Sequence, residues 1–112
     1  MKHTTIELFQ QGDVLLHKIK KIPNEAQATT KHVNAKGENV LAEGESTGHY
    51  HGMSSATTEL LEEGEEVFLR VKEDTEITHQ EHNKFVVPAG DYLVGIVEEY
   101  DHFAEEARRV QD

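Results

Sequence analysis

The chain contains no cysteine and no tryptophan, and only two of its 112 residues are proline. Without cysteine it can form no disulfide, no thiolate metal site and no thiol nucleophile. No apolar run approaches the about 20 residues that cross a bilayer, and residues 1–5 lack the apolar core of a signal peptide. We therefore expect a cytoplasmic protein with no membrane partner.

Basic residues are also scarce. The 11 lysines and arginines are outnumbered by 22 aspartates and glutamates, which gives a net charge of −11. Such a chain repels the phosphates of duplex DNA or RNA over most of its surface, so a general nucleic-acid binder is not expected. A small anionic ligand in a local pocket remains compatible with this charge, because the nearest side chains dominate the field at a site.

Apolar and polar residues alternate over much of the chain, which is the period of β-strands. We expect strands at residues 14–19, 40–42, 67–71, 75–79, 85–87 and 92–97. Residues 73–74 should join two of these strands in a hairpin, and the QGD sequence at 11–13 is interpreted as a turn that starts a strand. Short strands with turns at nearly regular spacing are typical of a small barrel or sandwich.

A chain of this length has room for one domain. We predict a single all-β domain over residues 1–112, a barrel or a sandwich of seven to eight short strands. Residues 102–112 are expected to form a tail with the propensity of a short helix.

Histidine, by contrast, is abundant and clustered. Four of the eight histidines lie in two short segments, as His49 and His51 in one and as His79 and His82 in the other. In an extended segment, residues two apart point to the same face, so Thr47, His49 and His51 should share a face. A neighbouring strand carrying the second segment would bring its side chains to that face. Imidazole exchanges protons near neutral pH and ligates transition metals, so both kinds of chemistry are in view.

One interpretation of the cluster is a metal site, which needs three or four convergent nitrogen or oxygen ligands. A divalent transition metal would draw its ligands from His49, His51, His79, Glu81 and His82. This set resembles the cupin arrangement, in which an His-x-His pair meets a later histidine and a glutamate within a small β-barrel. The chain departs from that pattern, because His79 and His82 precede the Pro-x-Gly turn at residues 88–90 and Glu59 lies far from His51.

A second interpretation needs no cofactor. One imidazole can take the proton of a 2′-hydroxyl while another protonates the leaving oxygen of the adjacent phosphodiester, which leaves a 2′,3′-cyclic phosphate. His49 or His51 would share these transfers with His82. A donor or cation must stabilise the developing charge. The candidates for holding the phosphate are Thr47, Tyr50 and Lys84.

The remaining interpretation is structural, in which histidines are exposed or satisfied by hydrogen bonds. It is preferred for the four isolated histidines, His3, His17, His32 and His102. A module that binds or sequesters a ligand without turnover also fits the clustered ones.

Several motifs together resemble a family of small bacterial, phage and plasmid proteins. They are QGDVL at residues 11–15, LAEGESTGHYH at 41–51, HQEH at 79–82, PAGDY at 88–92 and EY at 99–100. The family is similar to the small β-rich ring nucleases of type III CRISPR systems, which cleave cyclic oligoadenylate messengers in antiviral defence or in its suppression.

This resemblance implies a homodimeric, metal-independent phosphodiesterase, a hydrolase or lyase, acting on a small cyclic oligonucleotide. It implies catalytic roles for His49 and His51, with Glu81 and His82 as further catalytic candidates. We adopt that expectation, with the cupin-like metal protein and the non-catalytic binding module as alternatives.

Overall fold

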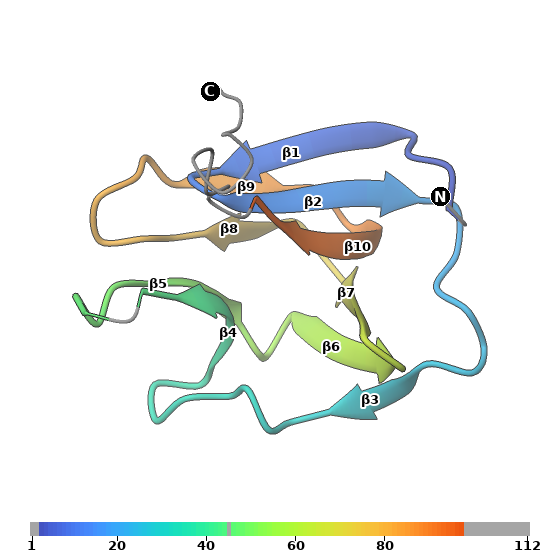
Figure 1. The fold of residues 1–112 in the computed structure, drawn as a ribbon, viewed down its shortest axis with the longest axis horizontal. Coiled ribbons are helices and arrows are strands. Elements are labelled where there is room, and N and C mark those ends of the chain that lie inside the picture. Colours follow the sequence, from blue (N-terminus) through green and yellow to red (C-terminus); the bar gives the residue numbers. More distant parts are fainter. Residues whose placement is uncertain (1–2, 45, 98–112) are drawn as a thin grey trace, which may run out of the picture.

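The computed structural model describes residues 3–44 and 46–97, and its strands form antiparallel sheets (Figure 1). The main sheet has six strands in the order β1-β2-β10-β7-β6-β3. Their bounds are β1 (Glu7–Gln11), β2 (Val14–Ile19), β10 (Gly90–Ile96), β7 (Glu66–Val71), β6 (Thr58–Glu63) and β3 (Gln27–Thr29). In Figure 1, β1 and β2 lie on one side of the molecule and β3 and β6 on the other.

Two smaller sheets form a second layer. Their strands are β4 (Glu38–Glu43) paired with β5 (Tyr50–Ser54), and β8 (Thr75–Ile77) paired with β9 (Phe85–Val87). A backbone bridge between Gly52 and Thr78 joins the two pairs through reciprocal N–H···O bonds of 3.0 Å. The layers make an all-β sandwich rather than a closed barrel, which confirms the predicted fold class.

The main sheet is covered on both faces. Consecutive residues of a strand point to opposite faces, and in β7 both Phe68 and Leu69 are fully buried. Leu69 joins Tyr92 in the larger apolar cluster, whereas Phe68 joins Ile19 and Ile22 in a second cluster. β7 is therefore a central strand with apolar packing on each side.

Strands 14–19 and 85–87 have the bounds expected from the sequence. The structure describes ten strands rather than seven or eight. β1 and β3 are short and mostly exposed and so lack a clear apolar alternation, and β6 was also not among the expected strands. The hairpin expected around residues 73–74 was wrong. β7 pairs with β6 and β10, and these residues instead carry the chain across to β8 in the other layer.

The tail expected at residues 102–112 lies outside the described residues. Within the described part of the chain, no helix is long and apolar enough to span a membrane.

Candidate functional site

The bridge between β5 and β8 sets the register of the two histidine segments. Because Gly52 opposes Thr78 in antiparallel fashion, His51 lies opposite His79. The centroids of these two rings are 4.3 Å apart. A single backbone pairing therefore brings together side chains that are distant in the sequence.

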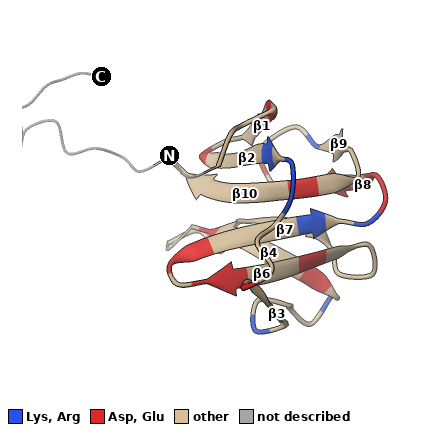
Figure 2. Cartoon of the chain, turned by 90° about the vertical axis from the view of Figure 1, so that its right-hand side faces the viewer, with Lys and Arg blue, Asp and Glu red and all other residues tan. Residues whose placement is uncertain are grey.

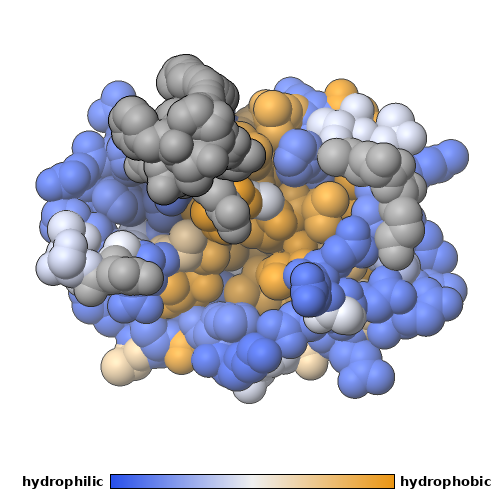
Figure 3. Space-filling model, viewed as in Figure 1, coloured by the Kyte–Doolittle hydropathy of each residue, from blue (hydrophilic) through white to orange (hydrophobic). Residues whose placement is uncertain are grey.

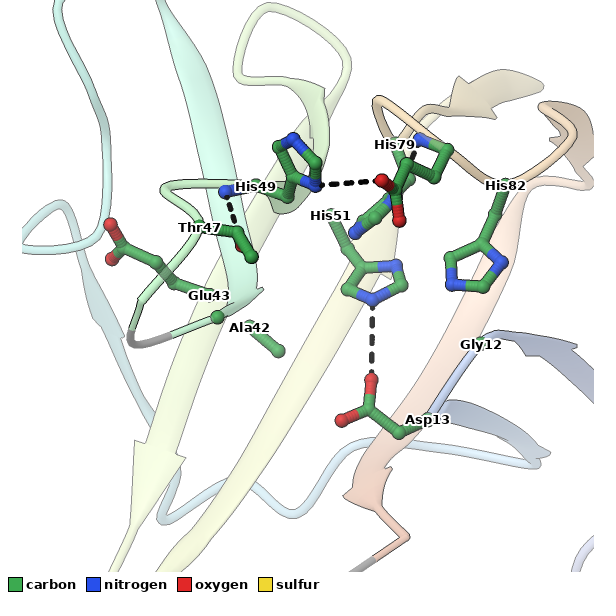
Figure 4. A pocket seen from close by; sticks show the side chains of 11 residues that line it. Gly12, Asp13, Ala42, Glu43, Thr47, His49, His51, His79 and His82 are labelled. Carbon is green, nitrogen blue, oxygen red and sulfur yellow. Dashed lines mark hydrogen bonds and ion pairs between the residues drawn. The ribbon is translucent and has the colours of Figure 1, made fainter.

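The same register places His49 opposite Glu81. Nδ1 of His49 is 3.7 Å from Oε2 of Glu81, in an exposed position at the edge of the cluster (Figure 4). The hydroxyl of Thr47 accepts the backbone N–H of His49 at 3.1 Å, which shapes the loop before β5.

His82 completes a group of closely spaced imidazoles above Gly12. Its ring is stacked on that of His51 at 5.8 Å and lies 4.5 Å from that of His79. Gly12 has φ of +57°, and a Cβ atom there would lie 2.6 Å from Nε2 of His82 and 3.1 Å from Cε1 of His51. Glycine is required at this turn both for its backbone angle and for the room that it leaves to the two rings.

The four imidazoles open into a cavity of about 460 Å³, within the range of small-molecule sites. It is lined by Gly12, Asp13, Ala42, Glu43, Gly44, Thr47, His49, His51, His79, Glu81 and His82. These lining residues include three carboxylates and neither lysine nor arginine.

Six of the candidate residues from the sequence thus line one cavity, namely Thr47, His49, His51, His79, Glu81 and His82. Tyr50 and Lys84 do not line it. Tyr50 points to the other face of β5, where its hydroxyl donates to Oε1 of Glu38 at 2.5 Å. Hydrogen bonds from Asn34 and then from Tyr50 lower the pKa of Glu38. Nζ of Lys84 lies 3.9 Å from Oε2 of Glu76.

Gln11 determines which nitrogen of His51 carries the proton. Its side-chain amide Nε2 donates to the carbonyl oxygens of Ile77 and Asn83, at 3.1 and 3.0 Å. These bonds fix the orientation of the amide, so its Oε1 faces Nδ1 of His51 at 2.8 Å. Because an amide oxygen can only accept, Nδ1 must donate, and the neutral ring then has its lone pair on Nε2.

This lone pair points at a carboxylate. Nε2 of His51 is 3.2 Å from Oδ1 of Asp13, with the His51 side chain 5% exposed and that of Asp13 57% exposed (Figure 4). When the ring is neutral, two acceptor atoms face each other and repel. A proton or a metal ion held between them turns the contact into an attraction. Since Gln11 engages Nδ1, Nε2 is the ring nitrogen of His51 that can take up a proton or a metal ion.

The surroundings favour the neutral form of two of these rings. Burial lowers the pKa of His51, the charge on a protonated His79 lowers it further, and Asp13 acts in the opposite direction. Burial also lowers the pKa of His79, followed by the effects of His82 and His49. A neutral imidazole is the form that accepts a proton or binds a metal.

His79 has the tautomer opposite to that of His51. The backbone N–H of Glu81 donates to Nδ1 of His79 at 3.0 Å, so the neutral His79 ring carries its proton on Nε2. Adjacent rings therefore present one bare nitrogen and one N–H group.

Within residues 3–44 and 46–97, no group of three or more histidine, aspartate or glutamate side chains is arranged to hold a metal ion. His51 and Asp13 form a close pair of potential donors, with three further imidazoles around them.

Sequence reasoning missed Gln11 and Asp13, which it assigned only to a turn. The turn exists, but it also delivers Asp13 to the cavity and Gln11 to His51. The available signal was the QGD motif itself, in which a polar glutamine directly precedes the turn. In the structure this glutamine, Gln11, is buried, with 3% of its surface exposed. Buried polar side chains need partners, and these often orient a functional group.

Three of the isolated histidines have contacts of their own, which suit a structural role. Nε2 of His3 lies 3.4 Å from Glu66, Nδ1 of His17 lies 3.1 Å from Thr5, and Nε2 of His32 lies 3.2 Å from Glu62. His102 lies outside the described residues.

Comparison with known proteins gives one family and no characterised relative. No curated protein and no solved structure matches the chain significantly. A family model described as a domain of unknown function, DUF8820, matches residues 10–96. The matched region contains every residue that lines the histidine cavity. The chain therefore belongs to the DUF8820 family.

Proposed function

We propose that this protein binds a divalent transition metal at His51 and Asp13 and uses it as an open centre in the histidine cavity. The observation that carries the proposal is the bare Nε2 of His51, oriented by Gln11 and facing Oδ1 of Asp13 at 3.2 Å. A metal-binding histidine commonly donates its second ring N–H to a fixed acceptor, which sets the tautomer and the ring orientation. Gln11 is such an acceptor.

The spacing of the two donors suits a shared ion. Two ligands at about 2.0–2.2 Å from a tetrahedral zinc ion lie about 3.3–3.6 Å from each other. The distance between Nε2 of His51 and Oδ1 of Asp13 is 3.2 Å, which is close to that range and also at the upper end of hydrogen-bond distances. Imidazole and carboxylate donors without thiolate suit zinc, iron, nickel or copper.

A third ligand must move to complete the site. His82 is the best candidate because its side chain is exposed and its Nε2 already lies above Gly12, next to the ring of His51. A change of side-chain rotamer would bring that nitrogen toward the ion. Three protein ligands leave a fourth position for water or a substrate, which is the pattern of catalytic rather than structural zinc sites.

Metal binding can be measured on the full chain by thermal unfolding with zinc or cobalt(II). An ion present at about 100 times its Kd adds about 2.7 kcal/mol to the free energy of unfolding. For a domain of this size we expect Tm to rise by about 10 °C, and a chelator should reverse the shift.

Magnesium is the control ion, because it prefers an all-oxygen octahedral site and should leave Tm unchanged. If zinc, cobalt and nickel also leave Tm unchanged, the proposal is wrong, and His51 and Asp13 form an ion pair that only stabilises the turn between β1 and β2.

A metal-independent ring nuclease is the second candidate, and the opposite tautomers of His51 and His79 favour it. Side by side, a bare nitrogen and an N–H group are the acceptor and donor that a proton-transfer mechanism needs. Its substrate would be a cyclic oligoadenylate bound by a homodimer, since a two-fold crevice can bind a two-fold symmetric ring.

We rank this candidate second because of the charges in the cavity. An oligonucleotide brings several phosphates, yet the lining residues offer Asp13, Glu43 and Glu81 and no lysine or arginine. Figure 2 shows further acidic residues where β6 meets β7. A metal ion suits an acidic cavity, whereas a phosphate is repelled by it.

Incubation with a cyclic oligoadenylate, with and without excess chelator, separates the two candidates. Under the metal proposal we expect no cleavage in chelator. Cleavage that survives chelator, yields a 2′,3′-cyclic phosphate and falls by ~10²–10⁴-fold in His79→Ala would establish the nuclease instead.

A further inference from the structure

An apolar groove lies between the two sides of the molecule and is separate from the histidine cavity, although β4 contributes residues to both. Figure 3 shows a hydrophobic hollow in the middle of this face, surrounded by hydrophilic residues. The groove has a volume of about 210 Å³. It is lined by His32, Val40, Leu41, Leu60, Glu65, Val67, Val94 and Ile96.

The size and chemistry of the groove suit protein side chains. Its volume is below the about 300–1,000 Å³ of typical small-molecule sites. Exposed apolar surface of this kind, rimmed by polar residues, commonly marks an interaction site. At one end of the groove, Ile96 is 43% exposed and the next residue, Val97, is 46% exposed.

The chain itself continues from this end of the groove. Ile96 is the last residue of β10 and lines the groove, and the N–H of Val97 donates to the carbonyl oxygen of Asp13 at 2.8 Å. This bond fixes the point from which residues 98–112 depart. Val97, to which the remaining 15 residues are joined, therefore follows directly on a residue of the apolar surface.

The sequence of residues 98–112 contains the matching chemistry. Tyr100, Phe103, Ala107 and Val110 recur at intervals of three and four residues, which is the sequence spacing of an amphipathic helix. The segment carries six acidic residues beside the two arginines at residues 108–109. The match between segment and groove is therefore one of apolar side chains and not of charge.

We propose that residues 98–112 dock on their own domain, with the face formed by Tyr100, Phe103, Ala107 and Val110 against the apolar groove. A short tether gives the segment an effective concentration in the millimolar range, so even weak packing suffices for docking. Burial of two aromatic rings supplies most of the driving force. The docked segment would contact Val40 and Leu41 of β4, and the last two residues of this strand, Ala42 and Glu43, line the histidine cavity.

The absence of native cysteine allows a direct test by disulfide trapping in the full chain. The test protein carries Leu41→Cys with Phe103→Cys, and the matched control carries Leu41→Cys with Glu105→Cys. Position 105 lies two residues along and faces away from position 103 in a helix. Under mild oxidation at low protein concentration, we expect an intramolecular disulfide to form at least about tenfold faster in the test protein.

Equal rates in the two proteins would overturn docking, and disulfide-linked dimers in place of cross-linked monomers would show that a second copy supplies the segment. Hydrogen exchange of the cysteine-free Phe103→Asp variant gives an independent measure. Loss of docking should speed amide exchange in β4 and at the end of β10 but not in β3. Unchanged exchange throughout would also contradict the proposal.

Discussion

Replacement of His51 by alanine is expected to abolish transition-metal binding while the domain stays folded. The change removes the nitrogen that Gln11 orients and leaves Asp13 alone as a preformed donor. Loss of an outer-shell partner typically lowers metal affinity by about 10–100-fold, and loss of a ligand should exceed that range. The measurement is calorimetric or spectroscopic titration with cobalt(II) or zinc, beside the thermal shift.

His17→Ala is the matched control, because His17 lies outside the cavity and contacts Thr5. It should retain the affinity and the thermal shift of the parent protein. If His51→Ala binds metal as tightly as the parent protein, the centre is elsewhere and the assignment of His51 fails.

The second large effect is expected for Gln11→Leu, which should lower both metal affinity and stability. Leucine has similar bulk, but it cannot donate to the carbonyl oxygens of Ile77 and Asn83 or accept from Nδ1 of His51. Each buried group left without a partner costs about 1–3 kcal/mol of unfolding free energy. Release of the His51 tautomer should weaken metal binding by about 10–100-fold.

Gln10→Leu provides the control at the neighbouring position, where the side chain is exposed and donates to the carbonyl of Gly12. We expect little change in metal affinity or Tm. A Gln11→Leu protein that loses stability but keeps full metal affinity would show that Gln11 supports the fold without orienting the centre.

The local features of the fold could be predicted from the sequence. The apolar residues of β2 and β9 mark them as strands whichever neighbours they pair with, so their bounds could be predicted. Which strands pair with one another could not be predicted. β7 and β8 are consecutive in the sequence, yet they lie in different layers and do not pair. That outcome depends on the burial of β7 on both faces, which is a property of the assembled core.

The candidate site was likewise predictable in its local features but not in its long-range ones. The spacing of His49 and His51 predicts a common face, because two-residue periodicity is local. The contribution of Gln11 and Asp13 depends on where the turn between β1 and β2 lands relative to β5, and no local pattern encodes that position. Likewise, the departure of Tyr50 to the opposite face follows from its position between the two histidines, whatever its chemistry.

The backbone bridge between Gly52 and Thr78 has a mechanical consequence. It joins the β4–β5 pair to the β8–β9 pair, and the histidines on its two sides belong to different pairs. An ion bound by both His51 and His82 would cross-link the two pairs of strands. Metal binding would then resist their separation, so the metal-bound protein should be stiffer between the two pairs than the metal-free protein.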